Sequence, residues 1–199
     1  MARTEIQRSQ SRNKNKGVRT MGLMMERAEG QENSRRRTLS FSSETPYNRW
    51  FGPEILDHSE GAVDLTRLNE VGVLLFNHDT DYVLGKVLRA WIEDGRGMAE
   101  VEFDTDEDAE KIFGKVENGT LKTTSVRYSV EVWEDVAAGK KSEDGRHTGP
   151  CSIAKQWTPL EISVISVPAD HTVGVGRSDE DEVDLTAYER QIQINKNYL

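Results

Sequence analysis

Alternating apolar and polar residues predict a chain built mainly from β-strands. A period of two residues places every second side chain on one face of a strand. This alternation marks residues 98–103 and 125–132, and Asp94-Gly95 with Arg96-Gly97 predicts a hairpin turn before the first of them. Further strand patterns begin near Thr38, cover residues 71–76, and run from Trp157 until Pro168 ends them.

One segment has the period of a helix instead. Its apolar residues recur at spacings of three and four, which forms a single stripe on a helix. The stripe consists of Ala109, Ile112, Phe113 and Val116. Thr105 is expected to cap the first turn with Asp108 as its partner, and Asn118-Gly119 is expected to end the helix.

Strands dominate this pattern and the connections between them are short, which favours a mostly β fold with helices, of the α+β class. We expect a small, mainly antiparallel β-barrel of about five to seven strands. One firm helix lies between the strand that ends at His78 and the strand that begins at Ser125.

Charge divides the chain into an arm, a body and a tail. Residues 1–50 carry a net charge of +6, which leaves −15 for the other residues of a chain whose total is −9. Residues 1–38 lack periodicity, so we expect a basic, disordered arm that precedes a folded domain at 39–176. Residues 177–199 read as an acidic linker followed by a weak C-terminal helix.

Composition also restricts the class of protein. An acidic body disfavours nucleic-acid binding, although the basic arm leaves that reading open. No apolar stretch approaches the roughly 20 residues of a membrane span, and no signal peptide is recognisable, so a soluble cytosolic protein is expected. The single cysteine, Cys151, excludes an internal disulfide, and the absence of HExxH or phosphate-loop motifs predicts no metal or cofactor.

The candidate chemistry begins with the four histidines. His78 alone ends an apolar strand between polar neighbours, and a neutral imidazole can serve as a general base. His58 is expected in a surface loop, His147 in a charged loop, and His171 just after the last strand. A structural, hydrogen-bonded turn histidine is the competing interpretation of His78.

A base needs a nucleophile and a third group that orients it. Ser125 opens the amphipathic strand after the helix and projects from its polar face. Glu161 lies between a proline and an apolar strand, where a charge is costly without a partner. The sequence leaves Asp79 and the pair Asp170-His171 open as alternatives to Glu161.

Three stretches in order resemble the signature blocks of the tailed-phage prohead (capsid maturation) serine proteases. These are VLLFNHDTDYVLGKV (73–87), GTLKTTSVRYSVEV (119–132) and PLEISVISVPAD (159–170). That family is distantly related in fold to the herpesvirus assembly proteases, and the resemblance extends over about residues 39–175.

The resemblance implies a role for each candidate residue. It makes His78 the general base, Ser125 the nucleophile and Glu161 the third catalytic member. Arg127 stands where the family usually has glycine, so it is a candidate contact for the oxyanion or for an acidic substrate. The implied reaction is peptide hydrolysis through an acyl-enzyme, without a metal or cofactor.

The implied substrates are the scaffold protein, the coat protein's scaffolding segment and the protease itself, inside the assembling prohead in the host cytoplasm. Self-association is a further expectation, because related folds can need dimerisation. A non-enzymatic capsid-assembly or scaffold-binding module on the same fold is the alternative, and Arg127 in place of glycine favours it.

Overall fold

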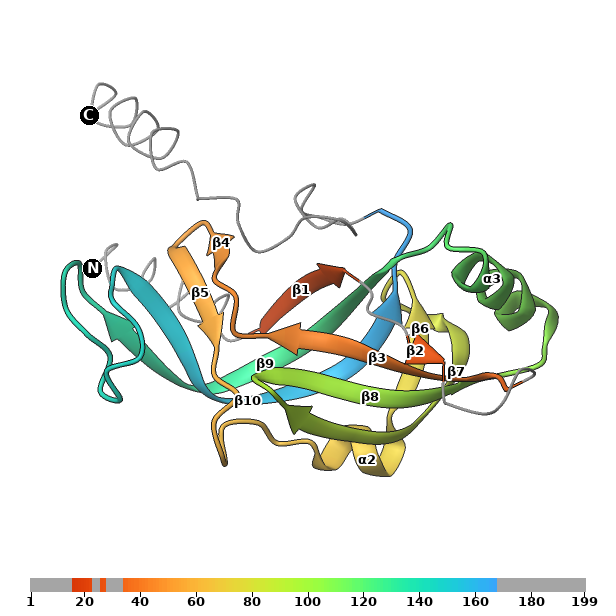
Figure 1. Ribbon diagram of the computed structural model, residues 1–199, viewed down its shortest axis with the longest axis horizontal. Helices are drawn as coiled ribbons and strands as arrows, with labels where there is room; N and C mark the ends of the chain where they lie inside the picture. The colour runs from red at the N-terminus through yellow and green to blue at the C-terminus, as the bar shows by residue number, and fades with distance from the viewer. Residues whose placement is uncertain (1–15, 23–25, 28–33, 168–199) are drawn as a thin grey trace, which may run out of the picture.

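The computed structural model describes residues 16–22, 26–27 and 34–167, and within them it forms one sheet that includes all ten strands and carries two helices. The elements, numbered as in Figure 1, are β1 (Lys16–Gly22), β2 (Glu26–Arg27), β3 (Arg36–Ser43), β4 (Tyr47–Arg49), β5 (Gly52–Leu56), α2 (Thr66–Val71), β6 (Val73–Phe76), β7 (Asp79–Glu93), β8 (Arg96–Phe103), α3 (Glu107–Glu117), β9 (Thr123–Val136) and β10 (Cys151–Val164). A mostly β fold with few helices is therefore confirmed.

The sheet is mixed, and its strand order is β1-β9-β10-β6-β7-β8-β3-β2. Most pairs are antiparallel, but β10 pairs in parallel with both β5 and β6. The sheet curls, because β3 lies against β9 although no ladder joins them, and Thr124 Oγ1 donates to the Ser40 carbonyl at 2.8 Å. Ten strands exceed the five to seven expected, since short strands such as β2 and β4 carry no alternation to detect.

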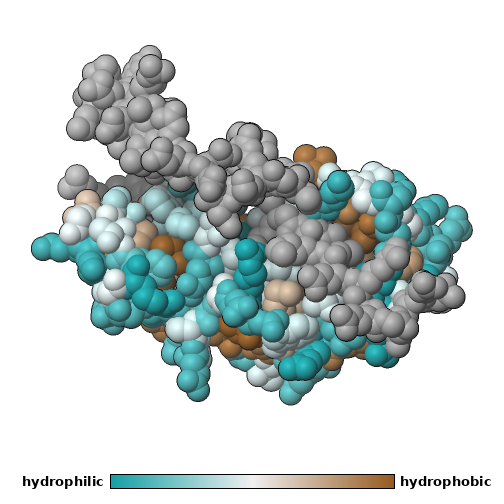
Figure 2. Space-filling view, viewed as in Figure 1, coloured by the Kyte–Doolittle hydropathy of each residue, from teal (hydrophilic) through white to brown (hydrophobic). Residues whose placement is uncertain are grey.

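The core fills the inside of this curl. Its largest fully buried side chains are Trp157, Tyr128, Phe41 and Phe103. Ala99, Val101 and Phe103 are all buried, as the alternation in β8 predicts. The face of the molecule shown in Figure 2 is mainly hydrophilic, with hydrophobic residues in separate patches. No helix among the described residues is long and apolar enough to cross a membrane.

The predicted helix is α3, which lies between the histidine and serine strands at one end of the molecule (Figure 1). Its cap differs from the expectation: Asp106, not Thr105, accepts the main-chain N–H groups of Asp108 and Ala109. A carboxylate is also favoured at this position by the helix dipole. Gly119 follows with φ +74°, which is the left-handed end that the sequence predicts.

The expectation of a wholly disordered arm over residues 1–38 is wrong for the described part. Residues 16–22 form β1 on the edge of β9, and Arg36–Thr38 belong to β3. This pairing depends on residues about 100 positions away, so no sustained alternation in the sequence predicts it. The acidic linker and weak helix expected at 177–199 lie outside the described residues.

Candidate active site

His78 lies in a two-residue turn between β6 and β7. Phe76 pairs with Asp79 across the turn, and Asn77 and His78 adopt φ values of 54° and 62°. Positive φ at both central residues is the hairpin geometry that suits the twist of the flanking strands, and asparagine and histidine tolerate it better than most residues. The apolar strand therefore stops here because a tight turn begins, and the turn presents the imidazole.

This turn is fixed to the end of β10. The Asn77 N–H donates to the Val164 carbonyl at 2.9 Å, and Asn77 Oδ1 accepts the Ser166 N–H at 2.9 Å. The His78 N–H donates to Ser163 Oγ at 3.1 Å. Three hydrogen bonds thus hold Asn77 and His78 against the end of β10.

Ser125 and Glu161 reach the same place from two neighbouring strands. In the antiparallel pair of β9 and β10, Ser125 is opposite Ser163, and Arg127 is opposite Glu161. Residues two apart on a strand point to the same face, so these four side chains share one polar face of the sheet. The turn carrying His78 lies beside it.

The three side chains form a continuous hydrogen-bonded chain. His78 Nε2 lies 2.7 Å from Ser125 Oγ, and His78 Nδ1 lies 2.5 Å from Glu161 Oε1. A carboxylate accepts only, so Nδ1 carries the proton and Nε2 is free to accept the hydroxyl proton of Ser125. This is the arrangement in which an imidazole can activate a serine.

The Glu161 carboxylate is buried but fully used. Its second oxygen, Oε2, accepts Ser163 Oγ–H at 2.7 Å, and the Arg127 guanidinium lies 3.6 Å from Oε1. These contacts offset the cost of burying a charge, and they fix the carboxylate that orients His78.

The other candidates lie elsewhere. The Asp79 carboxylate accepts the N–H of Asp81 at 2.9 Å, within its own turn. His147 lies between β9 and β10, in the charged loop as expected. Asp170 and His171 fall outside the described residues. Of the two candidates for the third group that the structure describes, Asp79 and Glu161, Glu161 is the one that contacts His78.

His58 is buried, so its expected position in a surface loop is wrong. Its Nε2 lies 2.7 Å from Ser42 Oγ, its Nδ1 lies 2.8 Å from the Leu56 carbonyl, and its ring packs edge-on against Trp157. Burial lowers the pKa of His58 to about 4. The polar residues after it misled the sequence reading, because the ring is packed by a strand about 100 residues away.

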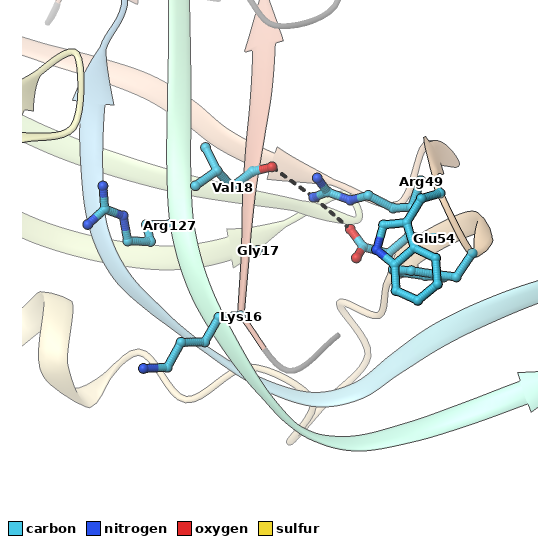
Figure 3. Close-up of a pocket in the computed structure, with 8 residues that line it drawn as sticks. Lys16, Gly17, Val18, Arg49, Glu54 and Arg127 are labelled. Atoms are coloured by element: carbon cyan, nitrogen blue, oxygen red, sulfur yellow. Dashed lines mark hydrogen bonds and ion pairs between the residues drawn. The ribbon is translucent and has the colours of Figure 1, made fainter. Parts of the chain in front are cut away.

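Arg127 turns back toward the site. Its guanidinium donates to the His78 carbonyl at 3.3 Å as well as contacting Glu161. Arg127 also lines a pocket of about 380 Å³, together with β1, Trp50, Phe51 and Glu54 (Figure 3). Contact with an oxyanion or with substrate stays a prediction for this residue.

β1 is a neighbour of the nucleophile that the sequence patterns did not indicate. Thr20 is opposite Ser125 in the ladder, and the Arg19 carbonyl lies 2.9 Å from Ser125 Oγ, as a second possible acceptor for the hydroxyl proton. Ser125 has no exposed surface as a result of this cover and its own strand neighbours. Val18 and Thr20, both β-branched, were the only local signal of a strand in this basic segment.

A family model described as Caudovirus prohead serine protease matches residues 50–186, which include His78, Ser125 and Glu161. The major capsid protein of Halomonas phage phiHAP-1 is 38% identical over 146 residues, which are 71% of this chain and 23% of that protein. This chain therefore spans under a quarter of that relative. No solved structure matches.

Proposed function

Because the chain belongs to the Caudovirus prohead serine protease family, we propose that it is a serine endopeptidase of phage head maturation. The observation that carries this proposal is the unbroken chain of hydrogen bonds from Glu161 through His78 to Ser125. Its substrates are the scaffold protein or the scaffolding segment of the coat protein, and the protease itself. It acts inside the assembling prohead in the host cytoplasm.

The mechanism assigns one role to each side chain. His78 Nε2 takes the proton of Ser125 as Oγ attacks the scissile carbonyl, and Glu161 stabilises the imidazolium that forms. His78 then gives this proton to the leaving amine, so the C–N bond breaks and an acyl-enzyme remains. Water, activated by the same imidazole, releases the acyl group and restores Ser125.

The tetrahedral intermediate needs donors for its oxyanion, and main-chain N–H groups near Ser125 supply them in this proposal. Removing one such donor costs about 3–4 kcal/mol in other serine proteases. Arg127 borders the pocket beside β1, which supports a contact with an acidic substrate group more directly than a contact with the oxyanion.

The proposed substrate class is supported by the name of a protein that matches this chain. A matching protein carries the name major capsid protein, and its aligned region is a small part of its length. Coat protein is therefore the first substrate to test. We also propose the distant fold relation to herpesvirus assembly proteases, supported by the curled sheet; an experimental structure with a flat, open sheet would contradict it.

A non-enzymatic capsid-assembly or scaffold-binding module is the second candidate. Two observations favour it: Arg127 occupies the position of the family's usual glycine, and Ser125 is fully covered. Such a module would bind coat or scaffold protein without cutting it.

Intact-protein mass over time separates the two candidates. The wild type and Ser125→Ala are each incubated with the cognate coat or scaffold protein. We expect fragments with the wild type and a loss of at least about a thousandfold in cleavage rate with Ser125→Ala, because the attacking atom is gone. Binding of the partner by both proteins with no cleavage by either would support the assembly module instead.

A further inference from the structure

One edge of β9, the strand that carries Ser125, is covered by a short strand from the same chain. β9 pairs with β10 on one side, and among the described residues only β1, the terminal strand of the sheet order, covers its other side. Seven residues of β1 run antiparallel along β9, from Lys16 opposite Ser129 to Gly22 opposite Thr123. Addition of an extended segment to a sheet edge is a common way for proteins to bind peptides.

β1 also engages the nucleophile directly. A serine hydroxyl has one proton to donate, and here both His78 Nε2 and the Arg19 carbonyl lie within hydrogen-bond distance of Ser125 Oγ, at 2.7 and 2.9 Å. A hydroxyl that donates to Arg19 cannot at the same moment donate to His78. β1 therefore competes with the base for the proton and excludes any other carbonyl from this position.

Arg19 and Gly17 of β1 pack closely against residues of the folded body. The Arg19 side chain is buried, with its guanidinium over the Tyr47 ring at 5.7 Å and attracted by the buried carboxylate of Glu54. Gly17 passes so close to Tyr128 that an added Cβ would lie 2.3 Å from the phenol oxygen.

A main-chain contact adds a third anchor. Arg49 donates to the Val18 carbonyl at 2.8 Å, and the same nitrogen contacts Glu54 at 3.2 Å (Figure 3). This nitrogen also lies 2.8 Å from the Tyr128 hydroxyl. Arg49 thus links the backbone of β1 to Glu54, the carboxylate that attracts Arg19.

The buried guanidinium of Arg19 does not make all of its hydrogen bonds, and we expect this to leave β1 displaceable. Arg19 Nη1 has no hydrogen-bond partner among the described residues although it is buried. A buried donor without a hydrogen-bond partner costs free energy. A competing peptide whose buried donors are all hydrogen-bonded does not have this cost.

We propose that the edge of β9 beside Ser125 is the substrate-binding strand site, and that β1 occupies it as an inhibitory segment. This rests on the proposed function of Ser125. A substrate binds as an extended antiparallel strand. It has an arginine at the position that Arg19 occupies and a glycine at the position where Gly17 passes Tyr128. The protease stays inactive until a substrate segment displaces residues 16–22.

The test uses the full chain and a fluorophosphonate, whose phosphorus is attacked by a serine with loss of fluoride. Gly17→Val adds side-chain atoms against Tyr128, and Arg19→Glu puts a second carboxylate beside Glu54. Gly114→Ala is the matched control, because an added Cβ there meets nothing within 4 Å. The rate of labelling at Ser125 is read by peptide mass mapping.

Both β1 variants are expected to label at Ser125 faster than the wild type, by about tenfold if β1 covers the site in nine molecules of ten. Gly114→Ala is expected to match the wild type. A synthetic peptide of residues 14–22 is expected to slow the labelling of Gly17→Val, and the same peptide with Arg19→Glu is expected to have no effect.

Equal labelling of Ser125 in the wild type and both variants would overturn the inhibitory strand while leaving the nucleophile intact. Failure of the 14–22 peptide to protect Gly17→Val would also overturn it. Absence of label at Ser125 in all of these proteins would overturn the proposed nucleophile as well, and the cleavage assay with coat protein would then decide the function independently.

Discussion

Two Ser–His pairs occur among the residues that the structure describes, and only one of them has the surroundings of a catalytic site. The Oγ–Nε2 distance is 2.7 Å both for Ser125 with His78 and for Ser42 with His58. Behind His78 lies the carboxylate of Glu161, whereas behind His58 lies the neutral carbonyl of Leu56. The distance between serine and histidine therefore says little by itself about chemistry.

The difference lies in which charge each imidazole can carry. A carboxylate stabilises the imidazolium that forms when a serine gives up its proton, and a carbonyl does so much less. Burial lowers the pKa of His58 to about 4, so this ring resists protonation. Ser42 and His58 form a satisfied polar pair in the core.

Coverage also differs between the two serines. Both have no exposed surface, but Ser42 lies within the packed core, whereas β1 covers Ser125 at the edge of the sheet. A segment that pairs at a sheet edge can leave without disturbing the core, so the two serines are buried with different consequences.

The largest expected effect comes from removing the charge that distinguishes the pairs. Glu161→Gln keeps the size of the side chain but cannot stabilise the imidazolium, so the rate of Ser125-dependent cleavage of coat or scaffold protein should fall by about 10³- to 10⁴-fold. Glu131→Gln, an exposed carboxylate on the same strand as Ser125, should leave the rate unchanged. Full activity of Glu161→Gln would remove Glu161 from the site.

A smaller effect is expected from the other histidine, and it concerns stability. The folded pKa of His58 is about 4, below the ordinary value of about 6.5, so the unfolded chain binds this proton more readily. The contribution of neutral His58 to the free energy of unfolding is complete above pH 6.5. It is lost as the pH falls from 6.5 toward 4, which lowers that free energy by about 3 kcal/mol.

His58→Gln should flatten this part of the pH dependence, as measured by urea unfolding at pH 7.5, 6.5, 5.5 and 4.5. The same variant should label at Ser125 at the wild-type rate at pH 7.5, because His58 takes no part in the reaction. An unchanged slope of stability against pH would show that another group titrates in this window.

The sequence predicted what local patterns encode. The alternation in β8, the apolar stripe of α3 and the Asp94-Gly95 turn, with φ values of 49° and 68°, were all recognisable without a structure. His78 was recognisable because a buried strand stops at polar residues, and a tight turn requires such a stop.

The remaining features depend on contacts between distant segments. β1 has only seven residues, of which two are basic and two are glycine, so its pairing with β9 leaves no periodic signal. Glu161 could not be separated from Asp79 or Asp170, because the sequence does not say which strand neighbours β9. The β9–β10 ladder places Glu161 opposite Arg127, two residues along the strand from the pair Ser163 and Ser125.

Mapping of a fluorophosphonate adduct tests the central claim most directly, because the two Ser–His pairs compete within one molecule. The wild type and Gly17→Val are labelled, digested and analysed by mass. The account predicts an adduct on the peptide that contains Ser125, its loss in Ser125→Ala, and no adduct on the peptide that contains Ser42. An adduct at Ser42, an adduct spread over many serines, or no adduct in either protein would contradict it.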